Sequence, residues 1–375
     1  MKSILWHLND YYDIFTIIKN VILKRKYILA FLLVFQILIL KILPFFSETI
    51  ETFYSNGLYP LLANFFRIIL GWIPFSIGDV LYFSLILLIA KWFWTNRKNW
   101  KTNWKDQILS ILSVLSVFYF FFHFLWALNY YRLPLFEKIK IERNYSDADL
   151  YLFTQKIIAR TNEVHFQITK NDSLKVSYPY SEEITFSKNL NGYQKLAVHY
   201  PFFNYQNLSI KKSLFSLPLT YMGFGGYLNP FTNEAQVNEL MPKYNLPTTS
   251  CHEMAHQMGY ASESECNFIG FLASVNNNDS YFKYSGYSFA LRYCLNNWYI
   301  RDEKIYKQLL QSVHPGILKN FQESEDFWQQ YETPIEKGFH AFYDRYLKLN
   351  QQHEGIESYS KFINLLVNYY KTRTL

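Results

Sequence analysis

Apolar residues gather in three long runs in the first third of the chain. These runs cover residues 27–46, 78–94 and 108–128, and a helix needs about 20 apolar residues to cross the hydrocarbon core of a bilayer. Polar residues within the runs are few and widely spaced. We therefore expect a membrane domain over residues 1–130 that contains about three transmembrane helices.

Another apolar segment, residues 59–77, has a different pattern. It is amphipathic rather than uniformly apolar, and Gly71 and Pro74 interrupt it. Backbone that leaves helical geometry at membrane depth must find hydrogen-bond partners in protein or at a polar surface. We expect this segment to lie at the membrane interface, or to re-enter the membrane, rather than to cross it.

Basic residues predict the orientation of these helices. Lys24, Arg25 and Lys26 precede the first run, and more basic residues lie between the second and third runs. The latter are Arg97, Lys98, Lys101 and Lys105, and Lys91 lies near the end of the second run. Because Lys and Arg accumulate in cytoplasmic loops, the N-terminus is expected in the cytoplasm and the chain after about residue 130 outside it. A cleaved signal peptide is the less favoured alternative, since no small-x-small pattern follows the first run.

The rest of the chain, residues 131–375, has the mixed composition of a water-exposed domain. Helical periodicity covers residues 281–370, with breaks near Pro315 and Gly355. Residues 221–238 combine glycines, a proline and alternating aromatics, which predicts a short β-hairpin or edge strand. The expected fold class is therefore mainly α, with transmembrane helices followed by a mostly helical α+β domain.

The candidate chemistry lies in the segment that begins His252-Glu253-Met254-Ala255-His256. Residues four apart lie on the same face of a helix, so the two imidazoles can both reach one tetrahedral zinc ion. The glutamate between them lies close enough to act on a metal-bound water. Five residues alone are weak support, because this pattern arises by chance in roughly one such sequence per hundred. The residues around the motif therefore decide whether it is interpreted as a metal site.

The flanking residues predict a helix, a glycine turn and a second helix. Pro247 with the following Thr248 and Thr249 suits a helix start, and Gly259 suits a left-handed C-cap. Ser262 and Glu265 then have the spacing of a capping box at the start of an apolar helix. This second helix would present an acidic first turn to the two histidines.

Two glutamates compete to be the third ligand. Glu263 and Glu265 lie about 200° apart on an ideal helix, so only one can point at the metal. We favour Glu263, because Glu265 would be engaged in the capping box and its face carries apolar residues. A metzincin site needs a histidine at position 262, and Ser262 excludes it.

The charge distribution and the cysteine count argue against a nucleic-acid partner and against a disulfide framework. The net charge of +7 belongs mainly to the residues that flank the apolar runs, and the soluble part has no basic stripe with interleaved aromatics. We therefore expect no nucleic-acid partner. The three cysteines, Cys251, Cys266 and Cys294, are too few for a disulfide framework, and we interpret them as small buried hydrophobic residues.

Several separate segments resemble, in the same order, a bacterial family of membrane proteins known as domain of unknown function 3810. The segments are residues 71–82, 126–130, 226–238, 249–259, 343–350 and 355–359. The resemblance covers most of the chain and implies a protein of the bacterial inner membrane with a metallopeptidase motif. It implies no particular substrate.

The stretch from Glu263 to Asn267 also resembles the Glu-x-x-Ala-Asp signature of one branch of membrane gluzincin peptidases. In that branch the glutamate binds zinc and the acid four residues later orients a ligand histidine. The resemblance implies that Asn267 takes the orienting position here. In peptidases of this general build, an edge strand beside the motif helix binds the substrate backbone. Glu234 and Asn238 would either line that cleft or stabilise the turn.

We expect a membrane-anchored zinc-dependent hydrolase, most specifically a metallopeptidase with a zincin-like domain, whose partners are the lipid bilayer and a peptide or protein substrate. The expected Zn²⁺ ligands are His252, His256 and one of Glu263 and Glu265. Zinc lowers the pKa of bound water towards ~7, and Glu253 would serve as general base. Tyr359 and His340 are candidates for stabilising the oxyanion. The alternative is an inactive zincin-like protein that acts as a binding or scaffold module.

Overall fold

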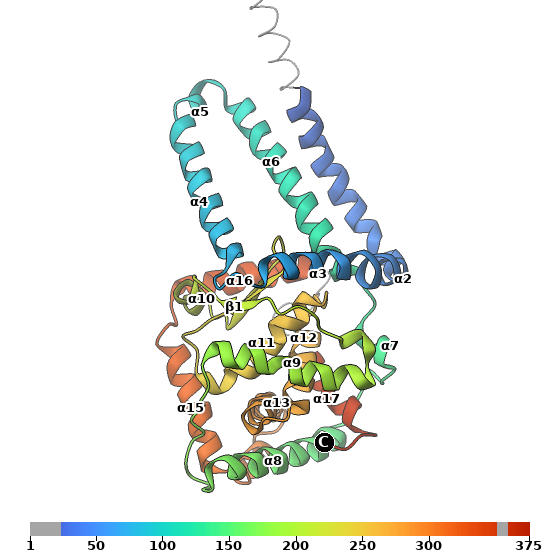
Figure 1. Cartoon of the computed structure of the whole chain (residues 1–375), viewed down its shortest axis with the longest axis vertical. Helices are drawn as coiled ribbons and strands as arrows, with labels where there is room; N and C mark the ends of the chain where they lie inside the picture. The colour runs from blue at the N-terminus through green and yellow to red at the C-terminus, as the bar shows by residue number, and fades with distance from the viewer. Residues whose placement is uncertain (1–23, 351–358) are drawn as a thin grey trace, which may run out of the picture.

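Three long apolar helices extend from one end of the molecule (Figure 1). The computed structural model describes residues 24–350 and 359–375, and only the backbone of residues 359 and 360. The first helix covers residues 24–42; the others are α4 (Ile77–Asn96) and α6 (Trp104–Leu125), joined by α5 (Asn99–Thr102). All three are long and apolar enough to cross a membrane, as predicted.

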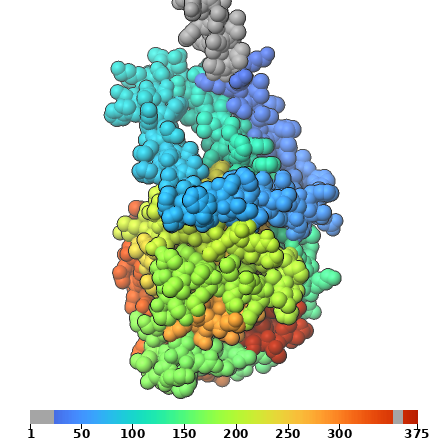
Figure 2. Space-filling view, viewed as in Figure 1, coloured from blue at the N-terminus to red at the C-terminus, as the bar shows by residue number. Residues whose placement is uncertain are grey.

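Helical structure does not stop at residue 46, where the predicted first span ends. From the first helix the chain continues through η1 (Leu43–Phe46), α2 (Ser47–Thr49) and the π-helix η2 (Ile50–Leu58) into α3 (Tyr59–Leu70). Within this segment the chain turns crosswise, so that α3 lies across the ends of the spans (Figure 1). Figure 2 shows the segment as a blue band between the spans and the larger body.

α3 has one face against the body and one exposed face. Tyr59 and Arg67 are buried, whereas Leu61, Phe65 and Ile68 are exposed. This amphipathic arrangement is typical of a helix that lies in a membrane interface. The residues that follow α3 form a turn and lead directly into α4.

The body below is mostly helical, as predicted, around a core in which α11, α12 and α13 pack against α8, α9 and α17. The helices are α7 (Leu135–Ile139), α8 (Asp147–Thr169), α9 (Glu182–His199), α10 (Ser216–Tyr221), α11 (Leu246–Gln257), α12 (Glu263–Asn276), α13 (Ser280–Arg301), α14 (Glu303–Leu310), α15 (Pro315–Gln329), α16 (Pro334–Leu349) and α17 (Tyr359–Tyr370), with short 3-10 turns η3 (Ala127–Tyr131), η4 (Pro201–Phe203) and η5 (Lys243–Asn245).

The predicted helical region 281–370 is divided at more places than expected. α15 begins at Pro315, as predicted, but α14 and α16 also begin within the region. The side chain of Asp302 caps α14 and that of Thr333 caps α16, with Pro334 in its first turn. Gly355, the other predicted break, lies outside the described residues.

The predicted β-hairpin is present and belongs to a three-stranded sheet. β2 (Gly226–Asn229) pairs antiparallel with β3 (Glu234–Val237), and Gly226 lies opposite Val237. β1 (Ile210–Lys212), which the sequence did not reveal, pairs parallel with β3, so the order is β1-β3-β2. β2 is therefore an edge strand, and it contacts the motif helix α11.

Buried charges join this sheet to the spans. Glu234 is fully buried, where it pairs with Lys211 and accepts hydrogen bonds from the first two backbone N–H groups of α4. A carboxylate at a helix N-terminus is stabilised by the helix dipole. Asp79, also fully buried, accepts hydrogen bonds from the hydroxyls of Tyr227 and Ser213. Glu234, a candidate cleft residue from the sequence, thus fixes the hairpin to α4.

Candidate metal centre

Three predicted ligands converge at the junction of α11 and α12. The Nε2 atoms of His252 and His256 are 3.1 Å apart. Oε2 of Glu263 lies 3.2 Å from Nε2 of His252 and 3.7 Å from Nε2 of His256. These distances suit a single ion: a tetrahedral zinc with bonds of about 2.0–2.1 Å holds its donor atoms about 3.3 Å apart. Two imidazole nitrogens and one carboxylate oxygen are also a donor set that zinc accepts.

The start of the motif helix is held by a proline in its first turn and by a contact with another helix. α11 has Pro247 in its first turn, as predicted, but the adjoining threonine hydroxyls do not cap it. The backbone N–H of Thr248 instead donates to the hydroxyl of Ser285 on α13, 3.2 Å away. The start of the helix is thereby fixed by a neighbouring helix.

Gly259 ends the motif helix, as predicted. Its φ is +84°, and its N–H donates to the carbonyl of His256, while the N–H of Tyr260 donates to that of Ala255. These two bonds form a Schellman motif, which requires a left-handed residue at this position. The turn brings the first residue of α12, Glu263, back beside the two histidines.

Another glycine sets the distance between the two helices. A Cβ added to Gly270 on α12 would lie 2.9 Å from the backbone nitrogen of His252 and 3.1 Å from its Cα. Only a residue without a side chain permits this approach. Gly270 therefore keeps Glu263 within reach of the histidines.

The predicted capping box is absent, and Glu265 lies outside the ligand cluster. Ser262 is the N-cap residue of α12, but its side chain makes no capping hydrogen bond. Glu265 instead accepts a hydrogen bond from the backbone N–H of Leu135, 2.6 Å from its Oε1. The structure thus assigns the two glutamates different roles, with Glu263 in the group of possible metal ligands.

Glu253 lies beside the cluster with an oxygen that has no partner. Its side chain is buried, and Oε2 has no hydrogen-bond partner in the part of the chain that the structure describes. Burial raises the pKa of this carboxyl to about 7, against the opposing effect of the two histidines. An orphaned carboxylate oxygen beside three converging ligands fits a site that takes a metal ion with a water molecule.

The edge strand begins directly against Glu253. A Cβ on Gly226 would lie 2.7 Å from Oε1 of Glu253 and 2.7 Å from the carbonyl oxygen of Gln236. Glycine at this position therefore lets β2 approach the carboxylate. Asn238, the other candidate cleft residue, donates to the hydroxyl of Thr220 and the carbonyl of Phe224, so it stabilises the adjoining loop.

The backbone of the glycine turn orients His256. Nδ1 of His256 lies 2.8 Å from the carbonyl oxygen of Tyr260 and 3.3 Å from Sγ of Cys266. A carbonyl acceptor keeps a proton on Nδ1 and leaves Nε2 available to a metal. Asn267 instead donates to the hydroxyl of Tyr293, 3.5 Å away. The backbone of the glycine turn thus orients the ligand.

A tyrosine that the sequence did not single out contacts the third ligand. The hydroxyl of Tyr343, on α16, donates to Oε1 of Glu263 at 2.7 Å. Burial and the adjacent Glu263 raise the pKa of Tyr343 well above its usual value, so the hydroxyl keeps its proton. One turn further along α16, the hydroxyl of Tyr346 is 3.2 Å from that of Tyr130. The only advance signal was that the segment 343–350 shares the family resemblance.

The structure describes the surroundings of only one of the two oxyanion candidates, His340. His340 stacks on Phe224, and its Nε2 lies 3.6 Å from a carboxylate oxygen of Glu336. Tyr359 begins α17, but its side chain lies outside the described residues. The expected role of either residue stays a prediction.

Residues near the ends of the apolar helices hold the end of the motif helix. The hydroxyl of Tyr59 donates to the carbonyl of Gln257 at 3.0 Å, and Nε1 of Trp126 donates to that of His256 at 3.2 Å. Arg132 donates to the carbonyl of Gly259 at 2.7 Å and is paired with Glu51. Carbonyls at a helix C-terminus lack partners within the helix, so these three donors satisfy them.

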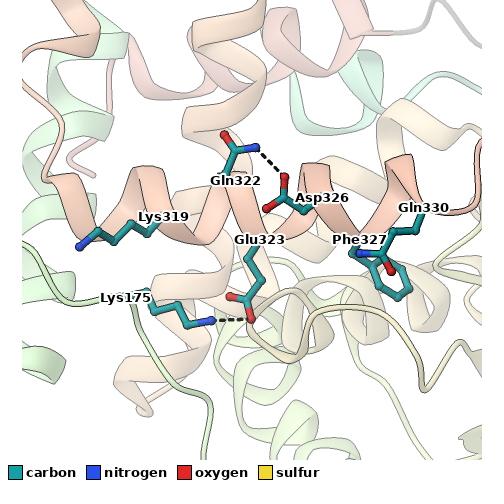
Figure 3. A pocket seen from close by; sticks show the side chains of 7 residues that line it. All are labelled: Lys175, Lys319, Gln322, Glu323, Asp326, Phe327 and Gln330. Carbon is teal, nitrogen blue, oxygen red and sulfur yellow. Dashed lines mark hydrogen bonds and ion pairs between the residues drawn. The ribbon is translucent and has the colours of Figure 1, made fainter.

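The three cysteines are free and buried, as predicted, and burial raises the pKa of the Cys266 thiol to about 11. A separate surface hollow lies along α15 (Figure 3). Its charged groups have partners: Lys175 pairs with Glu323, Gln322 donates to Asp326, and Lys319 donates to the carbonyl of Ser173. It contains none of the ligand residues, so the centre at α11 and α12 is the candidate site.

Comparisons with known proteins place the chain in a family without adding a function. Neither a curated protein nor a solved structure matches it. The family model that does match covers residues 54–367, which include α4, α6, the sheet, the ligand cluster and Tyr343. The chain belongs to the family described as protein of unknown function (DUF3810).

Proposed function

We propose that this protein is a membrane-anchored zinc-dependent hydrolase with a zincin-like domain, and most specifically a metallopeptidase. The observation that carries the proposal is the convergence of His252, His256 and Glu263 beside the unpartnered oxygen of Glu253. A purely structural metal site has no need of a buried, unpartnered carboxylate. That residue is the one that general-base chemistry requires.

The residues around the cluster divide the chemical work. His252, His256 and Glu263 would hold Zn²⁺, which when bound supplies a Lewis acid that makes water more acidic and polarises a carbonyl. Oε2 of Glu253 would accept a proton from water and deliver it to the leaving amine. Tyr343 fixes the orientation of Glu263 through its hydrogen bond, and the Tyr260 carbonyl does the same for His256.

The edge strand offers a means of holding a peptide. β2 pairs with β3 on one side, and its first residue, Gly226, lies against Glu253. An extended polypeptide that adds to the other side of β2 would be held by main-chain hydrogen bonds beside the cluster. This arrangement supports a peptide or protein substrate over a small molecule.

The proposed location is the bacterial inner membrane, with the N-terminus in the cytoplasm and the body outside it. Three helices have the length and composition of spans. Basic residues begin the first helix at positions 24–26, and others lie at positions 97, 98 and 101 between α4 and α6 and at position 105 in the first turn of α6. Basic loops remain on the cytoplasmic side, so the opposite ends of the spans, where the body begins, would face outward.

The experiment uses the full-length protein in detergent, because Tyr59 and Trp126 of the membrane part contact the motif helix. Zinc content is measured by mass spectrometry after metal-replete expression, and hydrolysis with a mixture of quenched fluorescent peptides. We expect one zinc per chain, retained in Glu253→Gln and lost in His252→Ala, with hydrolysis only in the unmutated protein. Sub-stoichiometric zinc in that protein would contradict the proposal, and zinc without any hydrolysis would favour the binding-module alternative.

A further inference from the structure

α16 carries an apolar face that the protein leaves exposed. At 100° per residue, Ile335, Phe339, Phe342, Tyr346 and Leu349 fall within an arc of about 80° on this helix. Three of these residues are largely exposed: Ile335 at 67%, Phe342 at 63% and Leu349 at 80%. A contiguous row of large apolar side chains in water is costly, and such rows mark interaction surfaces.

The same face of α16 contacts the base of a membrane span. The ring of Tyr346 lies 6.4 Å from that of Phe122, near the end of α6, and its hydroxyl contacts Tyr130 just beyond the span. Figure 1 shows α16 at the same height as α3, directly below the spans. The face defined by residues 335, 339, 342, 346 and 349 is therefore turned towards the level at which the bilayer ends.

We propose that α16 is seated in the surface of the bilayer that the three spans cross, with Ile335, Phe342 and Leu349 inserted among the lipids. The occupant of this face is lipid, because the face continues the apolar surface of α6 and lies level with the exposed face of α3. An amphipathic helix with this division of residues binds a membrane in the plane of the interface.

The polar residues of α16 fit the same placement. Lys337 and Lys348 lie about 200–220° from Ile335 on the helix, away from the apolar face, and both are exposed. Arg345 is exposed at the border of that face, where a long basic side chain can extend towards lipid headgroups. Tyr343 lies on the flank that faces the body, where it donates to Glu263.

This seating places the proposed metal centre close to the membrane surface. One helix would contact lipid on one side and the third ligand on the other. On the proposed function, a polypeptide that lies near the bilayer would be the accessible substrate. The seating itself rests on the apolar face and its contacts, so it is tested without reference to zinc or hydrolysis.

The test measures the surroundings of a spin label on the full-length protein in lipid nanodiscs. A nitroxide is attached to Phe342→Cys, to Lys337→Cys on the polar side of α16, and to Val114→Cys on the 68% exposed lipid side of α6. The unmutated protein, whose three cysteines are buried, gives the background. Collisions with oxygen, which dissolves in lipid, are compared with collisions with a water-soluble nickel complex.

We expect the oxygen-to-nickel ratio at Phe342→Cys to exceed that at Lys337→Cys several-fold and to approach that at Val114→Cys. Equal ratios at Phe342→Cys and Lys337→Cys, with a high ratio at Val114→Cys, would overturn the seating of α16. That outcome would leave the proposed function intact. Conversely, a protein that binds no zinc but gives the expected ratios would retain the seating and lose the proposed function.

Discussion

Two of the helices around the candidate metal centre, α11 and α16, are held in opposite ways. Ten of the twelve residues of α11 are buried, whereas only Leu347 of the sixteen residues of α16 is buried. α11 is packed by the core and capped by donors from the membrane part, while α16 meets the cluster through Tyr343. Packing in the core therefore fixes the position of the two histidines. The hydrogen bond that holds Glu263, in contrast, comes from a helix on the surface.

The largest expected effect comes from the support of α11 by the membrane part. In Glu51→Gln, the buried Arg132 keeps its charge but loses its ion-pair partner. Removing one member of a buried pair costs about 3–5 kcal/mol of folding free energy. The melting temperature in detergent should therefore fall markedly. The matched change Glu163→Gln, in an exposed pair with Arg160, should cost at most about 1 kcal/mol. Equal losses of stability in the two variants would contradict the distinction between the buried and the exposed ion pair.

Two glycine-to-alanine substitutions, one on the buried helix α12 and one on the exposed helix α16, extend this comparison. In Gly270→Ala, the new Cβ meets the backbone of His252, which should cost about 1–3 kcal/mol. In Gly338→Ala on α16, nothing lies within 4 Å of the added atom. This change should raise stability by up to about 1 kcal/mol, because alanine favours a helix. Thermal unfolding of both variants checks the prediction, and a shift of the same sign in both would refute it.

Removing the contact between α16 and the third ligand should affect the metal more than the fold. Tyr343→Phe deletes the hydroxyl that donates to Glu263 and keeps the ring. Loss of a group that orients a metal ligand typically weakens metal affinity about 10–100-fold. Competition with a zinc chelator measures this change, and the melting temperature of the apoprotein should stay close to that of the parent. Unchanged affinity would mean that Tyr343 does not position Glu263.

A smaller effect is expected at the carboxyl end of α11. Trp126→Phe removes the Nε1–H that donates to the carbonyl of His256 and should cost about 0.5–1.5 kcal/mol. Hydrogen exchange at the backbone amides of residues 255–260 should rise, since their helix end is less well held. A rise confined to other parts of the chain would argue against this role of Trp126.

The part of the site that the sequence revealed is the part encoded locally. The spacing of His252, Glu253 and His256 predicts a shared helix face, and Gly259 predicts the turn that returns the chain to Glu263. The spans were visible because bilayer thickness requires long apolar runs. In each case residues close together in the sequence determine the local backbone structure.

Contacts between distant segments were not readable in this way. Tyr343 is 80 residues from Glu263 along the chain, and in a chain with 32 tyrosines its identity gives no signal. The capping box failed for the same reason, because the distant Leu135 N–H became the partner of Glu265. The acceptor for Nδ1 of His256 is a backbone carbonyl, which every residue possesses, so no residue type could have announced it.

X-ray absorption at the zinc edge, on the full-length protein in detergent, tests the central claim most directly. The account predicts nitrogen and oxygen neighbours at about 2.0–2.1 Å, with the outer-shell scattering of two imidazoles from His252 and His256. Cys266 lies 3.3 Å from Nδ1 of His256, so a rearranged site could recruit its sulfur. A sulfur neighbour at about 2.3 Å, or a protein that retains no zinc, would contradict the account.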